Sequence, residues 1–538
     1  MSAESRLLTS LQSAPRRHSI WRGASCAAAA AALLLLCACT GAPPTATGTT
    51  FPGASAPSGA SPYPNGDLAN TRDATSSLIS STNVSSLHEA WSLKLTGEPA
   101  AGVKSVGAFA AAPVVVGGAA YIQDLDCNVY AVSLATGKLK WEYHVGKPET
   151  SGPGPNGVAV ANGRVYGDTP DSVFALEAAT GKAEWTNSGV LGSGDGSFEI
   201  QPAVADGRVY LASAYGSGSG GGLLLALSAS SGHVLWKFHT VTGATAQGVS
   251  SLGLGSGGAW ETPLVGTDGS VTFGVGNPYQ SIGSAVSHPS RQLYTDSLVN
   301  VDAATGKLRW YYQAVPNDFK DHDIQTSPVE TTIDGKPVVI GSGKLGYVVA
   351  TNAATGAMLW KTPVGVHNGT DDDSLRALSH VFRPKYPYTY EPGALGGVLS
   401  NIAVADGSVY VATLDLPFTL TKSSGVNGAP ASGTTGGGEV EALSLTTGKV
   451  DWDTKVSSLP LGATTVSRDL VFTTLYTGEL LALNRVTGAV VYRHRLPAST
   501  NAPIAVFGNT VLIPAGAPTT SGGAQGAAQL IAYTVSIR

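Results

Sequence analysis

Three aspartates lie within six positions of one another in the segment YYQAVPNDFKDHDIQTSPV. Carboxylates this close repel one another unless a cation lies among them. Asp318, Asp321 and Asp323 are therefore candidates for a metal site. A solvated acidic loop neutralised by Lys320 and Arg309 is the alternative, and the spacing alone leaves both interpretations open.

Three further residues could act with these acids. Asn277 follows an apolar stretch in Gly-Asn-Pro, and its amide oxygen is a hard ligand suited to Ca²⁺, although this tripeptide is more often a turn. Trp260 lies outside the repeat described below, and its indole could stack on a planar ring or pack an insertion loop. Lys344, in GSGKLGYVV, is placed at the tip of a predicted hairpin, where it could bind an anion or face solvent.

A repeat indicates which elements position these residues. It consists of an apolar strand, a small residue, Thr-Gly or Ser-Gly, and an aromatic residue four positions after the glycine. Glycine tolerates positive φ, so each turn predicts a hairpin between strands that have one buried face. Units of about 45 residues with four strands are typical of propeller blades. The copies end at Trp141, Trp185, Trp236, Trp310, Trp360, Trp452 and Tyr492.

The two ends of the chain supply one more blade. The first predicted strand, LHEAWSLKL (87–95), carries Trp91 in the repeat position, and the last strand, QLIAYTV (529–535), has no turn glycine after it. Pairing these two strands protects an otherwise open sheet edge. The sequence therefore predicts an all-β, eight-bladed β-propeller with insertions at 241–297 and 362–438.

This pattern resembles the PQQ-like repeat family, where PQQ is pyrroloquinoline quinone. The family includes quinoprotein alcohol dehydrogenases and the non-catalytic assembly factor of the outer-membrane β-barrel machinery. The resemblance covers nearly everything from about residue 67 to the end. The repeat specifies the fold and not the function. Its tryptophans are therefore expected to be structural and to lock one blade against the next.

The resemblance to quinoproteins implies a role for each candidate. Trp260 would form the floor under PQQ, and Lys344 would contact the oxygens and carboxylates of the quinone. Asn277, Asp321 and Asp323 would hold Ca²⁺ or a lanthanide. Asp321 would also take the alcohol proton while hydride moves to the quinone.

Other positions match the family less closely. Thr169 and Asn401 occupy loops that resemble its quinone-contacting loops. Ser217 stands where a metal-binding Glu is expected, which should weaken the metal site, and Ala110 replaces a quinone-contacting Glu. The stretch ETSGPGPNGVAV lacks the vicinal cysteine pair and the arginine of the family, with Asn156 nearest to the arginine. These departures remove contacts that the family uses to bind the quinone and the metal.

The N-terminal sequence predicts export. Arginines precede an apolar run from Ala27 to Leu36 that is too short to span a bilayer. The run ends in LCAC, which resembles a bacterial lipobox with Cys39 as the lipidated residue; a plain secretory signal is the alternative. We therefore expect a signal at 1–39, a flexible tether at 40–66, and a propeller at 67–538.

Composition limits the partners. The net charge of −5 gives no basic footprint, so nucleic-acid binding is not expected. Cys127 is the one cysteine outside the signal, and no haem or zinc motif occurs, so electrons would pass from the quinone to an external acceptor. We expect a monomer that contacts the membrane through its lipid.

Two functions from different classes fit the sequence. The first is an extracytoplasmic PQQ-dependent oxidoreductase that oxidises an alcohol or polyol with the help of Ca²⁺ or a lanthanide. The second is a non-catalytic, lipid-anchored β-propeller scaffold that binds other envelope proteins. The first function is favoured because the positions that match the family belong to its metal site and base and are not scattered.

Overall fold

The structure is a computed structural model of the chain that describes eight stretches of sequence. The export signal with Cys39, most of the predicted tether and Ser217 lie outside them. Within these stretches, no helix combines the length and apolar character needed to cross a membrane. The described residues are 61–95, 109–145, 156–192, 194–214, 221–241, 257–433, 436–516 and 528–536.

Eight antiparallel sheets in the described residues share one plan of four main strands. Seven sheets take these strands in chain order, and the eighth takes its fourth strand from the other end of the described chain. The first four sheets are formed by β2 (Val114–Val116), β3 (Ala119–Gln123), β4 (Val129–Ser133) and β5 (Leu139–Tyr143); β6 (Ala159–Ala161), β7 (Arg164–Thr169), β8 (Ser172–Glu177) and β9 (Ala183–Asn187); β11 (Ala203–Ala205), β12 (Arg208–Ala214), β13 (Leu223–Ser228) and β14 (Val234–His239), with β10 (Ser197–Phe198) also on β12; and β15 (Leu264–Val265), β16 (Ser270–Val275), β17 (Ser297–Asp302) and β18 (Leu308–Gln313).

The other four sheets repeat the plan. They are formed by β19 (Val329–Ile333), β20 (Lys336–Ser342), β21 (Tyr347–Asn352) and β22 (Met358–Pro363); β24 (Ala403–Ala405), β25 (Ser408–Leu414), β28 (Gly438–Ser444) and β29 (Val450–Val456); β30 (Thr465–Ser467), β31 (Leu470–Leu475), β32 (Glu479–Asn484) and β33 (Val490–Arg495); and β34 (Ala505–Phe507), β35 (Thr510–Ala515), β36 (Gln529–Thr534) and β1 (His88–Lys94), which follows the short 3₁₀ helix η1 (Val84–Ser86).

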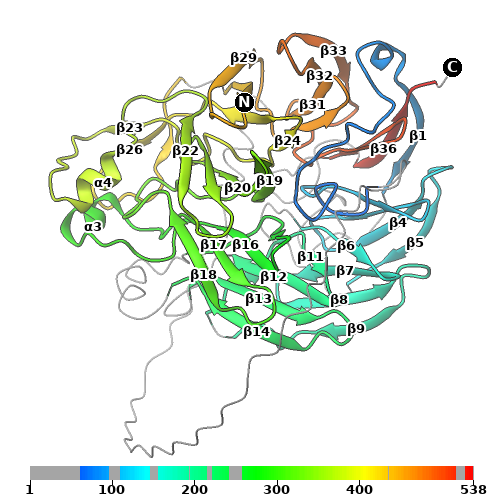
Figure 1. The fold of residues 1–538 in the computed structure, drawn as a ribbon, viewed down its shortest axis with the longest axis horizontal. Helices are drawn as coiled ribbons and strands as arrows, with labels where there is room; N and C mark the ends of the chain where they lie inside the picture. The colour runs from blue at the N-terminus through cyan, green and yellow to red at the C-terminus, as the bar shows by residue number, and fades with distance from the viewer. Residues whose placement is uncertain are drawn as a thin grey trace, which may run out of the picture.

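The sheets succeed one another around the molecule in chain order, as the colours of Figure 1 show. In most sheets the first three strands are almost wholly buried, whereas the fourth is partly exposed. The fold is therefore the all-β, propeller-like arrangement that the repeat predicted.

Tryptophans join neighbouring sheets, as the sequence predicted. Each lies in the fourth strand of one sheet, and its indole Nε1 donates a hydrogen bond of 2.7 to 3.1 Å to a backbone carbonyl of the next sheet. The turn glycine of that next sheet lies under the indole. A Cβ on Gly306 would come within 2.6 Å of Trp236 Cδ2. The tryptophans are Trp91, Trp141, Trp185, Trp236, Trp310, Trp360 and Trp452.

Replacing Trp236 by alanine is expected to lower the free energy of unfolding by about 3–5 kcal/mol. Trp236 is buried, and its indole bonds to Ala303 O at 3.0 Å, so the change opens a cavity between two sheets and removes one hydrogen bond. Urea unfolding measures the effect. Leu235→Ala is the control, because Leu235 is 48% exposed beside it and the change should cost less than about 1 kcal/mol. Equal losses in the two variants would contradict the structural role.

The first and last strands share one sheet. β1 pairs antiparallel with β36, from His88 opposite Thr534 to Lys94 opposite Gln529. β36 in turn pairs with β35. The pairing of the chain ends predicted from Trp91 is therefore present, and it covers an edge of β36 that would otherwise be open.

The folded part begins earlier than predicted. Asn65 is buried, donates to Ser327 Oγ at 3.1 Å and accepts from Arg72 Nη1 at 3.0 Å. The tether predicted for 40–66 is therefore wrong from residue 61 onward. The composition, rich in Gly, Pro and Ser, suggested flexibility, but buried polar side chains such as Asn65 hold this segment in place. Residues 61–79 form backbone hydrogen bonds with six sheets, at Val115, Val265, Glu330, Val404, Val466 and Gly508.

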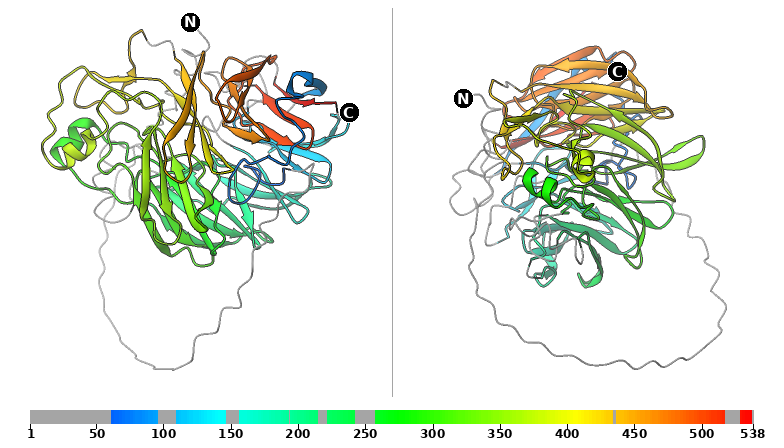
Figure 2. Two further views of the ribbon diagram at one scale, coloured as in Figure 1. Left: turned by 45° about the horizontal axis from the view of Figure 1, so that its top comes forward. Right: turned by 90° about the vertical axis from the view of Figure 1, so that its left-hand side faces the viewer.

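The two predicted insertions pack together on one side of the molecule. The first contains α3 (Ile282–Ser287), and the second contains α4 (Asp373–Leu378) and a sheet of β23 (Tyr388–Tyr390), β26 (Phe418–Leu420) and β27 (Ala429–Pro430). Figures 1 and 2 show α3 and α4 side by side. Their apolar residues form one cluster around Phe319, so both insertions support the acidic segment that follows β18.

Candidate active site

The acidic segment between β18 and β19 is buried. The exposed fraction is 0% for Asp318, 5% for Asp321 and 0% for Asp323. Asp318 serves the loop itself, because its carboxylate accepts the backbone N–H groups of Lys320 at 3.0 Å and His322 at 2.9 Å. Asp321 and Asp323 are thereby left as the acids available to a ligand.

Lys344 binds both of these acids. Its Nζ lies 3.2 Å from Asp321 Oδ2 and 2.6 Å from Asp323 Oδ2. The hairpin between β20 and β21 is fixed against the acidic segment, since Lys344 N donates to Asp323 O at 3.0 Å. Gly343 allows this approach, because a Cβ there would lie 1.9 Å from Asp323 O.

Asn277 and Trp260 complete the group. The backbone N–H of Asn277, just after β16, donates to Asp323 Oδ1 at 2.6 Å. The ammonium of Lys344 lies 5.9 Å from the centroid of the partly exposed Trp260 ring. Gly276 permits this packing, because a Cβ there would lie 2.7 Å from Asp323 Oδ1 and 2.9 Å from Trp260 Cη2. The structure thus brings together the five residues that the sequence singled out.

Burial and charge oppose one another at the two acids. Burial raises the pKa of Asp321 to about 7, although the Lys344 ammonium counteracts part of the shift. Burial also raises the pKa of Asp323. For Lys344, burial would lower the pKa, but the two carboxylates outweigh it and hold that pKa above its usual value. A carboxyl group that titrates near neutrality is suited to general-base chemistry.

Two oxygens of the group have neither a hydrogen-bond partner nor an ion-pair contact. Asn277 Oδ1 and Asp321 Oδ1 are both buried and unpaired in the described structure. Asn277 Oδ1 is a donor of the kind that a hard cation takes, and Asp321 Oδ1 is open either to a cation or to a proton. Among the described residues, no three His, Cys, Asp or Glu side chains lie close enough together to hold a metal ion. The predicted ligand set instead consists of two carboxylates, from Asp321 and Asp323, and the amide oxygen of Asn277. These three side chains supply oxygen ligands that fit a hard cation.

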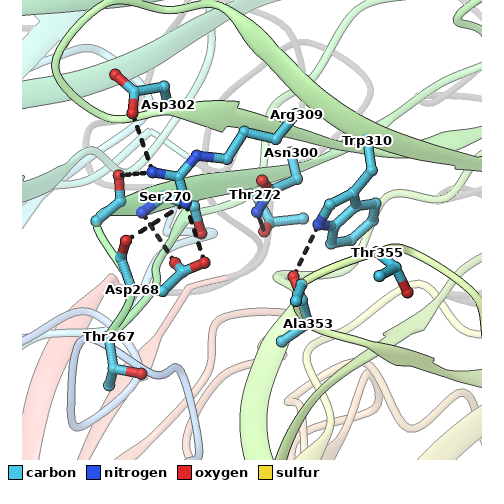
Figure 3. A network of polar contacts seen from close by, with 12 residues as sticks. Thr267, Asp268, Ser270, Thr272, Asn300, Asp302, Arg309, Trp310, Ala353 and Thr355 are labelled. Carbon is cyan, nitrogen blue, oxygen red and sulfur yellow. Dashed lines mark hydrogen bonds and ion pairs between the residues drawn. The ribbon is translucent and has the colours of Figure 1, made fainter.

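The alternative of a solvated, neutralised acidic loop is wrong. Figure 3 shows Arg309 turned to a different network, where it pairs with Asp268 at 3.0 Å and Asp302 at 2.9 Å. Lys320 is buried, and its ammonium donates to Thr370 O. Lys344 is the cation that pairs with both acids.

Thr169 and Asn401 are more distant from this group. Thr169 Oγ1 donates to Asp171 Oδ1 at 3.0 Å and lies 2.6 Å from Ser172 Oγ, so it stabilises its own hairpin. Asn401 accepts the backbone N–H of Ser327 at 2.8 Å and donates to Glu261 Oε2 at 2.9 Å. Its contact with Glu261, which follows Trp260, places it beside the site, whereas no contact among the described residues joins Thr169 to the site.

Sequence reasoning missed one residue of the site. Asn427, in the second insertion, donates from Nδ2 to Asp321 Oδ2 at 3.0 Å. The local sequence around this residue, Asn427-Gly428, predicts a turn. It does not indicate that the turn contacts Asp321, which lies 106 positions earlier in the chain.

Comparison with known proteins gives two family matches. Residues 62–368 match the family described as glucose/ethanol/alcohol dehydrogenase, β-propeller domain. Residues 436–534 match the family described as outer membrane protein assembly factor BamB. The first match covers more than half of the chain and includes Trp260, Asn277, Asp321, Asp323 and Lys344.

Individual relatives agree with the first match. The quinohemoprotein alcohol dehydrogenase ADH-IIG of Pseudomonas putida is 28% identical over 316 residues, which are 52% of this chain. This chain spans 42% of the length of that curated relative. The quinohemoprotein alcohol dehydrogenase of Comamonas testosteroni superposes with a TM-score of 0.72 at 22% identity, covering 89% of this chain and 81% of that one. A europium-containing methanol dehydrogenase gives 0.71 at 18% identity, covering 88% and 98%. These two superpositions show a shared fold.

Proposed function

Because the chain belongs to the glucose/ethanol/alcohol dehydrogenase β-propeller family, we propose that it is a PQQ-dependent oxidoreductase that oxidises an alcohol or polyol outside the cytoplasm. The observation that supports this most strongly is the buried group in which Lys344 joins Asp321 and Asp323 beside Trp260. Stability alone does not explain it, because a buried ion pair contributes little net stability.

Each residue of the group has a chemical role in this proposal. The planar face of Trp260 would support a flat ring, and the Lys344 ammonium would bind the carboxylates of an anionic cofactor. Asn277 Oδ1, Asp321 and Asp323 would hold the cation. When bound, PQQ supplies the acceptor for one hydride, which carries the two electrons of the oxidation. Asp321 would take the proton of the alcohol hydroxyl.

Ca²⁺ or a lanthanide is the proposed cation. The available ligand atoms are all oxygens, which hard cations prefer. Two carboxylates and one ammonium leave a net charge of about −1 in a buried place, which favours a multivalent cation. A europium-containing enzyme shares the fold, which adds support for a lanthanide.

We also propose the features that the sequence predicts beyond this site. The eight sheets would form a closed eight-bladed ring, supported by the β1–β36 pairing. The mature protein would be a monomer held at the membrane by a lipid on Cys39. Electrons would pass to an external acceptor.

A non-catalytic scaffold is the second candidate. The match of residues 436–534 to the BamB family favours it, as do Ser217 and the missing cysteine pair and arginine. The scaffold requires no quinone and gives no reason for the Lys344 group, so it is the weaker proposal.

A reconstitution experiment separates the two functions. The purified full-length protein is mixed with PQQ and either Ca²⁺ or La³⁺ and passed through a desalting column. We expect the quinone to remain bound and to support dye-linked oxidation of alcohols, and chelation of the cation to abolish the activity. Protein that leaves the column without quinone under both conditions would support the scaffold.

A further inference from the structure

The turn between β26 and β27 brings a side chain of the second insertion to the acid proposed as the base. Asn427 Nδ2 donates to Asp321 Oδ2 at 3.0 Å. The same turn is attached to the first insertion, where Gly283 N donates to Ser423 O at 2.8 Å. The two insertions therefore fix the position of this amide.

The two oxygens of Asp321 are in different surroundings. Oδ2 accepts the Asn427 amide and lies 3.2 Å from Lys344 Nζ. Oδ1 is buried and has no hydrogen-bond partner in the described structure. A buried acceptor without a partner lowers the stability of the folded state. Oδ1 is therefore the oxygen of Asp321 that is available to accept a proton or a ligand.

We infer that Asn427 is a positioning residue that, together with Lys344, holds Oδ2 of Asp321 and leaves Oδ1 to take the proton of the substrate hydroxyl. This inference rests on the proposed function and assigns the base to one atom. In the step, the O–H bond of the alcohol breaks and its proton goes to Oδ1. The hydrogen on the carbon leaves with both bond electrons for the proposed quinone, and the alcohol becomes a carbonyl compound.

The backbone of Asn427 has a separate structural role. Its carbonyl oxygen accepts the Tyr390 hydroxyl at 2.6 Å, and that hydroxyl also lies 3.0 Å from Lys320 O. The φ of Asn427 is 57°, a value that Asn and Gly adopt readily. Asn427→Gly therefore keeps the turn and the carbonyl contact and removes only the amide that touches Asp321.

The test compares steady-state kinetics of the full chain loaded with PQQ and Ca²⁺ or La³⁺, with ethanol and glycerol as probe alcohols. We expect Asn427→Gly to lower kcat by about 10- to 100-fold, because small misplacements of a catalytic group cost up to this much. KM, the PQQ dissociation constant and the melting temperature should stay unchanged. Asn427→Asp should lose more, since it places a second carboxylate against Asp321.

His380→Gly is the matched control. His380 is exposed, lies in the same insertion and has a φ of 59°, so this change is equally compatible with the backbone. It should leave all four quantities unchanged.

The possible outcomes separate this inference from the proposed function. Wild-type kcat in Asn427→Gly, in an active enzyme, would overturn the inference and leave the function intact. A melting temperature that falls together with quinone affinity would also overturn it, because Asn427 would then be only a structural contact. Wild-type protein that binds no quinone or oxidises neither alcohol would overturn the function and the inference with it.

Discussion

Asp321→Asn is expected to lower kcat/KM for alcohol oxidation by about 10²- to 10⁴-fold, the usual contribution of a general base. The amide has nearly the same shape as the carboxyl group and can still accept from Asn427, but it cannot take a proton. PQQ retained after desalting should stay close to the wild-type amount, because Lys344 keeps Asp323 as a partner at 2.6 Å. Steady-state rates and the absorbance of retained quinone measure the two effects separately.

Asp302→Asn is a control that the chain itself suggests. Asp302 lies in the Arg309 network of Figure 3, and its Oδ1 accepts the backbone N–H of Thr305 at 3.0 Å. Asn352 and Asn484 make the same turn contact in other sheets, so asparagine fits this position. The control should keep wild-type activity. An Asp321→Asn enzyme as active as the control would exclude Asp321 as the base.

The fold could be predicted because its rule is local and repeated. Each turn glycine stands four residues before an aromatic residue, and the structure explains both positions. The glycine has positive φ and lies under the tryptophan of the preceding sheet, as Gly306 lies under Trp236. The need for a glycine under the tryptophan of the preceding sheet recurs in seven sheets. The same short motif therefore appears seven times in the sequence.

The site could be predicted in part. Asn277 follows β16, Lys344 lies in the hairpin between β20 and β21, and the two acids lie in the segment between β18 and β19. The resemblance to quinoproteins singled out these residues, and the structure brings them together. Asn427 could not be found in this way. It lies in an insertion outside the repeat, and its contact with Asp321 depends on how two insertions pack around Phe319.

One prediction and one alternative fail for the same reason. Composition assigned residues 61–66 to a tether, yet Asn65 bonds to Ser327, which is 262 positions away. Proximity in sequence assigned Arg309 to the acidic loop, yet its strand directs it to Asp268 and Asp302. In both cases the partner depends on the tertiary fold, and the neighbouring sequence does not indicate it.

Lys344→Met is expected to lower the free energy of unfolding by about 3–5 kcal/mol at neutral pH or above, because it leaves two buried carboxylates without a counter-ion. The loss should depend on pH. The ammonium lowers the pKa of both acids, so its removal moves the pKa of Asp321 further above about 7. A carboxyl group whose pKa is raised in the folded state stabilises the protein at low pH, and this contribution disappears as the pH rises through that pKa. The variant should therefore approach wild-type stability near about pH 5 and depart from it most near about pH 8.

Urea unfolding of the chelated, quinone-free protein at these two pH values measures the difference. Lys449→Met is the control, since Lys449 is exposed and its loss should change stability by less than about 1 kcal/mol at either pH. Adding Asp321→Asn and Asp323→Asn to Lys344→Met should restore much of the lost stability, because the buried charges are then gone together. A Lys344→Met protein whose stability loss is the same at both pH values would show that the ammonium acts by packing. The acids would then be neutral in the free protein. The proposal that the charges of this group bind a cation and an anionic cofactor would be wrong.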